Sequence, residues 1–144
     1  MTLSWIRERN AVWNADKARI IGRAPVGIFD TRYGQLREGD LVPAEWWRVE
    51  DDGRTVAYGG LGVNWGDAEI PPATEPGAPG RGVGTFVLKH LELEARARGL
   101  NYMYNLVRPT HPDGDRLTAW LVRRGFEAAR DGRLLRSVPY EPDA

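Results

Sequence analysis

The chain contains no cysteine and only two histidines, His90 and His111, among its 144 residues. The absence of cysteine excludes disulfide bonds, a thiolate nucleophile and a cysteine-bound metal, and two histidines argue against a zinc site. Twenty basic residues balance twenty acidic ones, so the overall charge favours neither nucleic acid nor an anionic membrane as the main partner. The chemistry of this protein must therefore rest on other groups, and no metal is expected.

Long apolar runs are also missing. No stretch approaches the roughly 20 residues that are needed to span a bilayer. The N-terminus lacks the basic and then apolar layout of a signal peptide, so we expect a cytoplasmic protein without a membrane partner. A chain of this length is expected to form one domain that buries about two-thirds of its unfolded surface.

Glycine, by contrast, is plentiful, and three glycines fall within five positions of the segment 80–85, which reads GRGVGT. Glycine lets the backbone turn tightly and approach a ligand, because no Cβ blocks the way. The run from Phe86 to Arg98 that follows has one apolar stripe and predicts a helix ending at Gly99. Unpaired amides at the start of such a helix favour a phosphate, although a plain strand-to-helix turn is the alternative.

Known glycine motifs narrow this interpretation. A dinucleotide fingerprint would need a third glycine where Thr85 stands, and no Gly-Lys-Ser/Thr follows to form a nucleotide-triphosphate loop. Neither of the common nucleotide motifs fits the segment.

The N-terminal part, residues 1–40, is expected to be helical or irregular. Apolar residues between Ser4 and Arg23 recur at seven- to eight-residue intervals and predict one or two helices. Val26 to Phe29 could form a short strand, and the segment from Thr31 to Asp40 is polar and turn-like.

The middle of the chain has the pattern of a sheet. Glu45 to Glu50 and Arg54 to Trp65 predict two strands of a hairpin around Asp51-Asp52-Gly53. Asp67 to Glu75 could continue the sheet, but Pro71-Pro72 cannot donate ladder hydrogen bonds and imply a bulge or break.

The C-terminal part predicts a strand, a helix and a closing hairpin. Asn101 to Val107 should lie parallel to the strand before the glycine segment. Asp113 or Asp115 can cap a helix that runs to Arg124. Phe126 to Val138 should fold back around a type I′ turn at Asp131-Gly132, and residues 139–144 look like a tail.

Three segments give this order of elements a family likeness. Ala68-Glu69-Ile70 looks like a fourth strand, Pro79 to Gly84 stands where an Arg/Gln-x-x-Gly-x-Gly/Ala loop would fall, and Leu121 to Phe126 looks like a helix ending in Gly-Phe. In these features the chain resembles the GNAT superfamily of acyl-CoA-dependent N-acyltransferases. The resemblance implies a single α/β (α+β) domain over 1–144, with a mixed, mostly antiparallel sheet flanked by helices and a bulged strand before the glycine loop. The predicted helical start departs from the family, which normally opens with a strand.

The resemblance also implies acetyl-CoA as the bound cofactor. The backbone amides of residues 81–85 would face its pyrophosphate. Attack on the thioester forms a tetrahedral oxyanion, which the backbone amides of Ala73 and Thr74 would stabilise, because the preceding Pro71 and Pro72 have no N–H group. Pro79 stands in place of the motif's Arg or Gln, so contact with the cofactor would rest mainly on the backbone. The predicted cofactor-binding residues are Ala73, Thr74, Arg81, Gly82, Val83, Gly84 and Thr85.

The implied reaction needs a base and an acid. An amine with a pKa of ~10.4 is neutral in only about one molecule in 2,500 at pH 7, a penalty of roughly 4.6 kcal/mol. Glu69 matches the base of the family's histone acetyltransferases, and partial burial would make it a stronger base. Leu121 stands where many members have a tyrosine that protonates the thiolate, which leaves Tyr104 and His111 as candidate donors. Each of these residues also has a purely structural interpretation: Glu69 as a glutamate on an edge strand, Tyr104 as a half-buried aromatic of a strand, and His111 as an exposed loop residue.

Other polar and aromatic residues have structural alternatives. Of the adjacent Trp46 and Trp47, one should point into the core and the other outward, to shape an acceptor pocket or a contact between copies in a homodimer. We expect core packing for the tryptophans at 13, 65 and 120, an outward position for His90, and a structural role for Asn105 over a contact with the acceptor or pantetheine.

The resemblance leaves three functions open. The first is transfer of an acetyl or similar acyl group from acetyl-CoA to a primary amine of a small molecule or peptide. The second uses a macromolecular acceptor, such as aminoacyl-tRNA or a DNA base, which a basic face of Arg96, Arg98, Arg108 and Arg116 would support, although the balanced charge argues against nucleic acid. The third is an acyl-CoA sensor or interaction module without turnover, suggested by Leu121.

Overall fold

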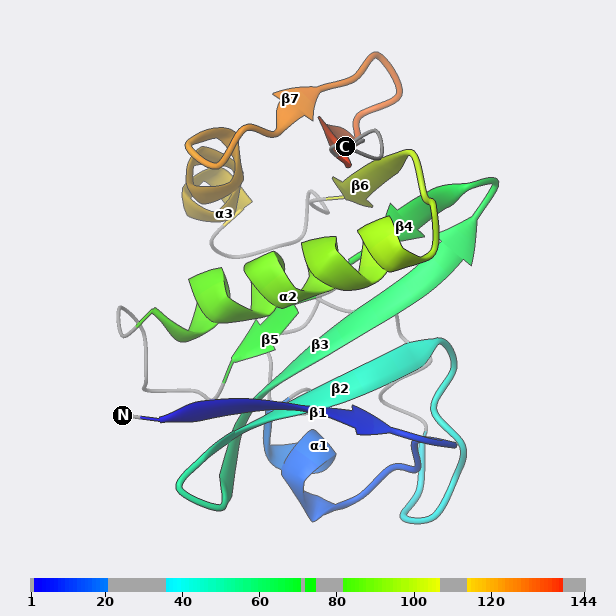
Figure 1. Cartoon of the computed structure of the whole chain (residues 1–144), viewed down its shortest axis with the longest axis vertical. Coiled ribbons are helices and arrows are strands. Elements are labelled where there is room, and N and C mark those ends of the chain that lie inside the picture. The colour runs from blue at the N-terminus through cyan, green and yellow to red at the C-terminus, as the bar shows by residue number, and fades with distance from the viewer. Residues whose placement is uncertain (1, 21–35, 71, 75–81, 107–113, 139–144) are drawn as a thin grey trace, which may run out of the picture.

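The computed structural model describes residues 2–20, 36–70, 72–74, 82–106 and 114–138 (Figure 1). Over these residues, eight strands form one mixed sheet in the order β1-β2-β3-β4-β6-β8-β7, with β5 paired to β3. β4 and β6 are parallel and the other pairs are antiparallel, as expected from the sequence. The elements are β1 (Leu3–Glu8), α1 (Ala15–Ile20), β2 (Glu45–Asp51), β3 (Arg54–Asn64), β4 (Asp67–Glu69), β5 (Pro72–Thr74), α2 (Val83–Ala97), β6 (Tyr102–Asn105), α3 (Gly114–Val122), β7 (Glu127–Ala128) and β8 (Leu134–Ser137).

The start of the chain corrects the predicted helix over Ser4 to Arg23. Residues Leu3–Glu8 form strand β1, which pairs with β2 from Leu3 opposite Asp51 to Glu8 opposite Trp46. Leu3 and Trp5, two positions apart, both pack against the main core, so the side-chain period here is that of a strand. Of the described residues in this region, Ala15–Ile20 form a helix, so one of the predicted helices is present in part; Val26 to Phe29 lies outside the described residues.

The β2–β3 hairpin confirms the prediction for the middle of the chain. Its turn places Asp52 and Gly53 at φ values of 51° and 82°. The two strands carry the centre of the sheet, and α2 crosses one face of it in Figure 1. The main core lies between α2 and this face.

The adjacent tryptophans point to opposite faces, but neither is outward. Trp47 is 1% exposed in the main core, and Trp46 is 0% exposed in a second core with Trp13, Ile20 and Tyr58. The prediction of an outward tryptophan is wrong because α1 and the residues around it cover the second face of the sheet.

The three tryptophans predicted to pack in the core differ in their burial. Trp13 is buried, and Trp120 packs against the main core while partly exposed. Trp65 is 97% exposed and contradicts the prediction. It occupies the turn between β3 and β4, where it and Gly66 both have positive φ, at 52° and 80°.

The sheet is interrupted between β4 and β5, as the prolines predicted. β4 pairs with Gly62–Asn64 of β3, whereas β5 pairs with the separate stretch Ala57–Gly59. β4 instead gains β6 as a parallel neighbour on its other side. The end of β4 is thus the point where this sheet changes partners.

Helix α2 begins three residues earlier than its apolar stripe predicted, so Val83–Thr85 belong to its first turn. Its C-terminus is as expected: Gly99 has φ 66°, and the Leu100 amide donates to the Ala95 carbonyl at 3.1 Å. This is the hydrogen bond of a Schellman ending.

Two C-terminal details differ from the predictions. Asp115 lies inside the first turn of α3 and does not cap it, while Asp113 is outside the described part of the chain. The β7–β8 hairpin forms, but its turn is not type I′: φ is positive at Gly132 (89°) and not at Asp131. The Gly132 amide donates to the Ala129 carbonyl at 3.1 Å, so the turn spans residues 129–132.

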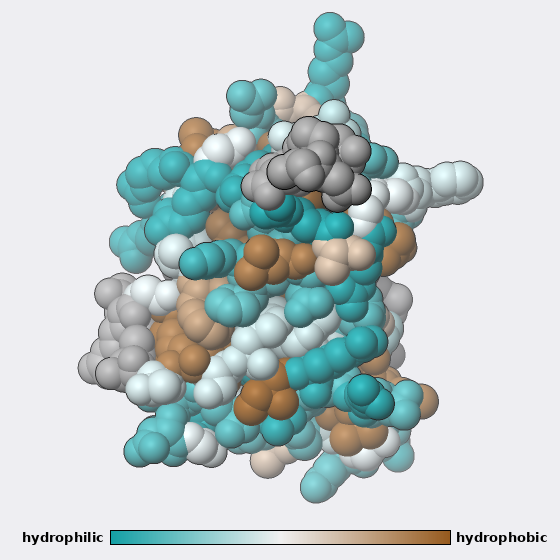
Figure 2. Space-filling model, in the orientation of Figure 1, coloured by the Kyte–Doolittle hydropathy of each residue, from teal (hydrophilic) through white to brown (hydrophobic). Residues whose placement is uncertain are grey.

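The surface shown in Figure 2 is mostly hydrophilic, and its hydrophobic residues form separate small groups. Among the helices that the structure describes, none is long and apolar enough to cross a membrane.

Candidate active site

The first turn of α2 presents backbone amides without helical partners. Phe86 is the first residue whose amide bonds within the helix, to the Gly82 carbonyl at 3.0 Å. Gly82 is the N-cap, has φ 77° and makes no side-chain cap, and the first turn holds no acidic residue. The amides of Gly82 to Thr85 therefore have no hydrogen-bond acceptor among the described residues, at the positive end of a 15-residue helix.

A tryptophan and an arginine of the α3 region lie against this turn. A Cβ on Gly84 would approach the Trp120 ring to 3.4 Å, so the glycine lets the indole pack closely on the helix. The Arg124 guanidinium stacks over the same ring, 3.9 Å from its centroid, and donates to Thr85 Oγ1 at 3.1 Å. Figure 1 shows α3 next to this end of α2.

Arg124 makes no ion pair with any carboxylate of the described residues. Burial and the neighbouring Arg123 lower the pKa of its guanidinium below the ordinary value. A cation beside a helix N-terminus is electrostatically unfavourable unless an anion joins it. The sequence pattern did not single out Arg124, because its proximity to Thr85 depends on the packing of α3.

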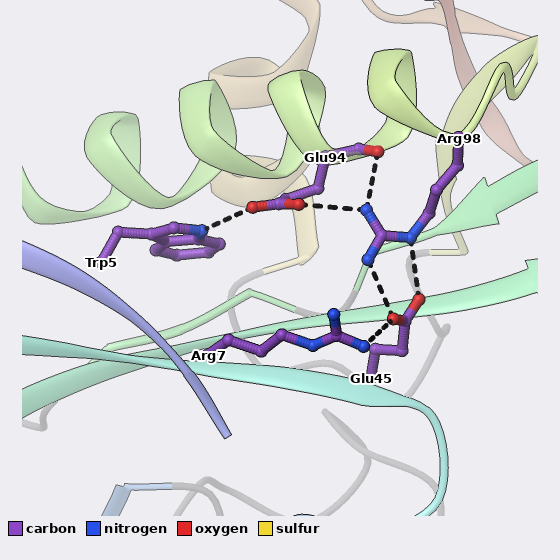
Figure 3. Close-up of polar contacts among 5 residues, drawn as sticks. All are labelled: Trp5, Arg7, Glu45, Glu94 and Arg98. Atoms are coloured by element: carbon purple, nitrogen blue, oxygen red, sulfur yellow. Dashed lines mark hydrogen bonds and ion pairs between the residues drawn. The ribbon is translucent and has the colours of Figure 1, made fainter. Parts of the chain in front are cut away.

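The opposite end of α2 is fixed by a polar network, drawn in Figure 3. Arg98 donates to both carboxylate oxygens of Glu45, at 3.0 and 2.9 Å, and to Glu94 at 3.0 Å. The Trp5 indole also donates to Glu94, at 3.2 Å, so the network joins α2 to β1 and β2. These contacts make Arg98 a structural residue and remove it from the basic face considered above; Arg108 is outside the described residues.

Strands β4 and β6 stop pairing at Ile70 and Asn105. The Ile70 amide donates to the Tyr104 carbonyl at 3.1 Å, which is the last backbone bond between the two strands among the described residues. The Ile70 carbonyl accepts instead from the Asn105 side-chain amide at 2.9 Å. This confirms the structural role of Asn105, which closes the ladder where the strands part.

Glu69 and Tyr104 lie side by side just before this point. They are register partners, and the Tyr104 hydroxyl donates to Glu69 Oε2 at 3.2 Å. The Asn64 side-chain amide donates to the same hydroxyl oxygen at 3.1 Å. Glu69 is exposed, so the partial burial expected for it is wrong, whereas the Tyr104 residue is 4% exposed and burial raises the pKa of its phenol.

The remaining predicted residues fall into three groups. Ala73 and Thr74 lie in β5, where they pair with Tyr58 and Ala57 of β3. Arg81 and His111 are outside the described residues. Leu121 is 0% exposed within the main core.

His90 corrects an expectation about the outer face of α2. It is half-buried, and its ring lies 4.1 Å from that of Phe86 and 5.2 Å from that of Trp5. Within the part of the chain that is described, no three acidic or histidine side chains gather into a group that could hold a metal.

Solved structures share this fold at low sequence identity. N-acetylglutamate synthase from Neisseria gonorrhoeae, complexed with coenzyme A and N-acetyl-glutamate, gives a TM-score of 0.68 at 19% identity, covering 97% of this chain and 36% of the synthase. The ribosomal-protein-S18-alanine N-acetyltransferase of Escherichia coli gives 0.67 at 16% identity, covering 99% and 97%. A putative GNAT-family acetyltransferase from Desulfovibrio desulfuricans gives 0.68 at 14% identity, covering 96% and 100%.

At these identities the likeness establishes the fold, and this chain spans little more than a third of the synthase. No curated protein sequence matches the chain significantly. A family model does match it, over residues 9–126, and its description is the acetyltransferase (GNAT) family. The interruption of the sheet between β4 and β5 and the first turn of α2, both within the matched residues, agree with that match. The chain belongs to the GNAT family of acetyltransferases.

Proposed function

We propose that this protein transfers an acetyl or similar short acyl group from acetyl-CoA to a primary amine of a small molecule or peptide. The observation that carries the proposal is the first turn of α2, where the backbone amides have no partner within the helix and the Arg124 guanidinium donates to Thr85, without an acidic partner among the described residues. Such a turn suits a phosphate group.

The residues present fit the phosphate part of coenzyme A. The amides of Gly82, Val83, Gly84 and Thr85 would hold its pyrophosphate, with the predicted Arg81 amide beside them. The guanidinium of Arg124 would add a charge-assisted bond that compensates for the absent side chain at Pro79. When bound, the thioester supplies the activated acyl group.

Glu69 is the proposed general base. Its carboxylate is exposed and can be reached by an amine from solvent. An ammonium group loses a proton to Glu69 Oε1, and the neutral amine is then nucleophilic. The proposed donor to the oxyanion is whichever of the Ala73 and Thr74 amides faces away from β3, because adjacent amides of a strand point to opposite sides. His111 remains a proposed donor to the thiolate.

Two similar structures support the proposed acceptor class. One is named for acetylation of glutamate and the other for acetylation of an alanine of ribosomal protein S18. Those names support a small molecule or a peptide as acceptor, and both belong to the proposal. The alternative of a macromolecular acceptor bound by a basic face is weakened, because Arg98 is engaged in ion pairs with Glu45 and Glu94.

Binding of the donor can be tested by stability. A ligand at a hundred times its dissociation constant adds about 2.7 kcal/mol to the free energy of unfolding. Acetyl-CoA should therefore raise the melting temperature by several degrees, and adenosine should not. No shift with acetyl-CoA or any other coenzyme A ester would exclude the proposal.

The base is tested by Glu69→Gln. This substitution should leave acetyl-CoA binding unchanged, because Glu69 lies on β4 and away from the first turn of α2. It should lower kcat/KM by roughly 100-fold, the usual contribution of a general base. Unchanged turnover with an unchanged pH profile would remove Glu69 from the mechanism.

One observation favours a second function, acyl-CoA binding without turnover. Leu121 is completely buried, so this position offers no proton donor to the site. A protein of that kind would show the thermal shift with acetyl-CoA but no amine-dependent release of free thiol.

A further inference from the structure

A three-residue hydrogen-bond chain crosses from β3 to β6 and then to β4. Asn64 Nδ2 lies 3.1 Å from the Tyr104 hydroxyl oxygen, and that hydroxyl lies 3.2 Å from Glu69 Oε2. The amide of Asn64 has only protons to offer at Nδ2, so the Tyr104 oxygen accepts there. The single phenolic proton is consequently directed to Glu69.

The surroundings keep this proton on Tyr104. The residue is 4% exposed, and its ring is covered by the Arg133 guanidinium at 4.8 Å from the centroid. Burial raises the pKa of the phenol, so it is neutral and a donor at physiological pH. An acceptor bond from Asn64 and a donor bond to Glu69 satisfy the hydroxyl in that state.

The geometry also directs the hydroxyl away from the place where the strands part. Asn64 pairs with Asp67 at the start of β4, whereas the strands separate beyond Glu69, at Ile70. A hydroxyl held between Asn64 and Glu69 is suited to orienting the carboxylate. In this arrangement its single proton is engaged by Glu69 and is not free for a departing thiolate.

We propose that Tyr104 is the positioning residue of Glu69, with Asn64 setting the direction of its proton. The Tyr104 bond holds Oε2 and leaves Oε1 of the carboxylate for the amine. During transfer the amine proton moves to Oε1, and Tyr104 keeps its own proton. This inference rests on the proposed base role of Glu69. It assigns Tyr104 to the support of the general base, and not to protonation of the thiolate.

A hydrogen bond donated to the carboxylate holds it in one orientation, and misplacement of a catalytic group lowers turnover. Loss of this bond in Tyr104→Phe should lower kcat by roughly tenfold, while the KM for acetyl-CoA stays unchanged. The charged groups near the site are Asp67 on β4, and Arg133, which contacts Asp67 at 3.8 Å and Asp131 at 2.7 Å. These groups are unchanged by the substitution.

Tyr102→Phe is the matched control, because Tyr102 is on the same strand, 44% exposed, with no hydrogen bond from its hydroxyl among the described residues. It should leave kcat unchanged. Asn64→Ala should lower kcat as Tyr104→Phe does, but by less, because the Tyr104–Glu69 bond remains. Asn64 is exposed, so this variant serves even if Tyr104→Phe folds poorly.

A readout without turnover separates this inference from the proposed function. Carboxyl NMR of the free protein, at one fixed pH, gives the chemical shift of the Glu69 side-chain carboxyl in wild type, Tyr104→Phe and Tyr102→Phe. A changed chemical shift in Tyr104→Phe alone supports the inference, because only that variant loses the bond to Oε2. Equal chemical shifts in all three proteins overturn it, even if acyl transfer is observed. Absence of acyl transfer in the wild type, with a changed chemical shift in Tyr104→Phe, would overturn the proposed function and with it the role of the hydrogen bond in catalysis.

Discussion

Arg98 and Glu45 form a two-bond ion pair that ties the last turn of α2 to β2, at 3.0 Å from Nε and 2.9 Å from Nη2. The bonds to Glu45 raise the pKa of Arg98, and its side chain is 24% exposed. Because α2 also carries the candidate phosphate site at its other end, this pair fixes the helix on which the site depends (Figure 3).

Arg98→Met should lower the free energy of unfolding by about 1–2 kcal/mol, since hydrogen bonds to Glu45 and Glu94 are lost from a partly exposed site. The matched control is Lys89→Met, which changes an exposed residue of the same helix. Urea unfolding of both variants measures the difference. Equal stability of the two would show that the network contributes nothing.

Gly59→Ala should destabilise the sheet. A Cβ at this position would stand 2.6 Å from the Trp5 ring, which is stacked on Trp47 with centroids 5.5 Å apart. Overpacking of this kind costs about 1–3 kcal/mol. Gly62→Ala, on the same strand, meets its nearest atom at 4.0 Å and should be tolerated. Thermal melts measure both variants, and equal melting temperatures of Gly59→Ala and Gly62→Ala would refute this expectation.

Arg124→Ala should weaken acetyl-CoA binding by roughly tenfold or more, the contribution of a charge-assisted hydrogen bond. Arg123→Ala removes a charge from the adjacent, exposed position and should change binding less. Calorimetric titration at constant salt gives both dissociation constants. The same loss in both variants would mean that Arg124 acts only through general charge.

Leu121→Tyr should not create a proton donor. Leu121 is fully buried in the main core, so the larger, polar side chain should cost about 1–3 kcal/mol and leave turnover no higher. Leu121→Phe separates the effect of size from that of the hydroxyl. A faster Leu121→Tyr enzyme would show that the position does face the reaction.

Stability should fall above about pH 10. Burial raises the pKa of Tyr58, and the nearby Glu8 and Asp16 raise it further. The folded state then keeps a proton that the unfolded chain loses, so the contribution is complete below the unfolded pKa and declines as the pH rises past it. Tyr58→Phe keeps the ring that lies 4.9 Å from the Lys17 ammonium and should flatten the decline between pH 9 and 11, by about the effect of one tyrosine. An unchanged slope in unfolding experiments would contradict this.

The elements that the sequence predicted well are those whose pattern is local. The β2–β3 hairpin follows from alternating residues around Asp52-Gly53, and the end of α2 follows from Gly99. β1 was missed because Trp5 and Ile6 are adjacent apolar residues, and pairing with β2 selects a strand where the spacing also suited a helix.

The site divides in the same way. Glu69 was predicted through the family resemblance, and the amides of α2 were predicted from the glycine spacing and the helix that follows it, so both predictions depend on short segments. Asn64 and Arg124 could not be found, because each reaches its partner across the fold: Asn64 is 40 residues from Tyr104, and Arg124 is 39 from Thr85. Tertiary packing alone brings those pairs together.

Acyl transfer itself is tested most directly by the release of free thiol from acetyl-CoA in the presence of a panel of primary amines, including free amino acids and a peptide with a free N-terminus. The proposal predicts amine-dependent thiol release, matched mole for mole by the N-acetylated amine in mass spectrometry and reduced in Glu69→Gln. Binding of acetyl-CoA without release above the amine-free rate, for every amine, would contradict it.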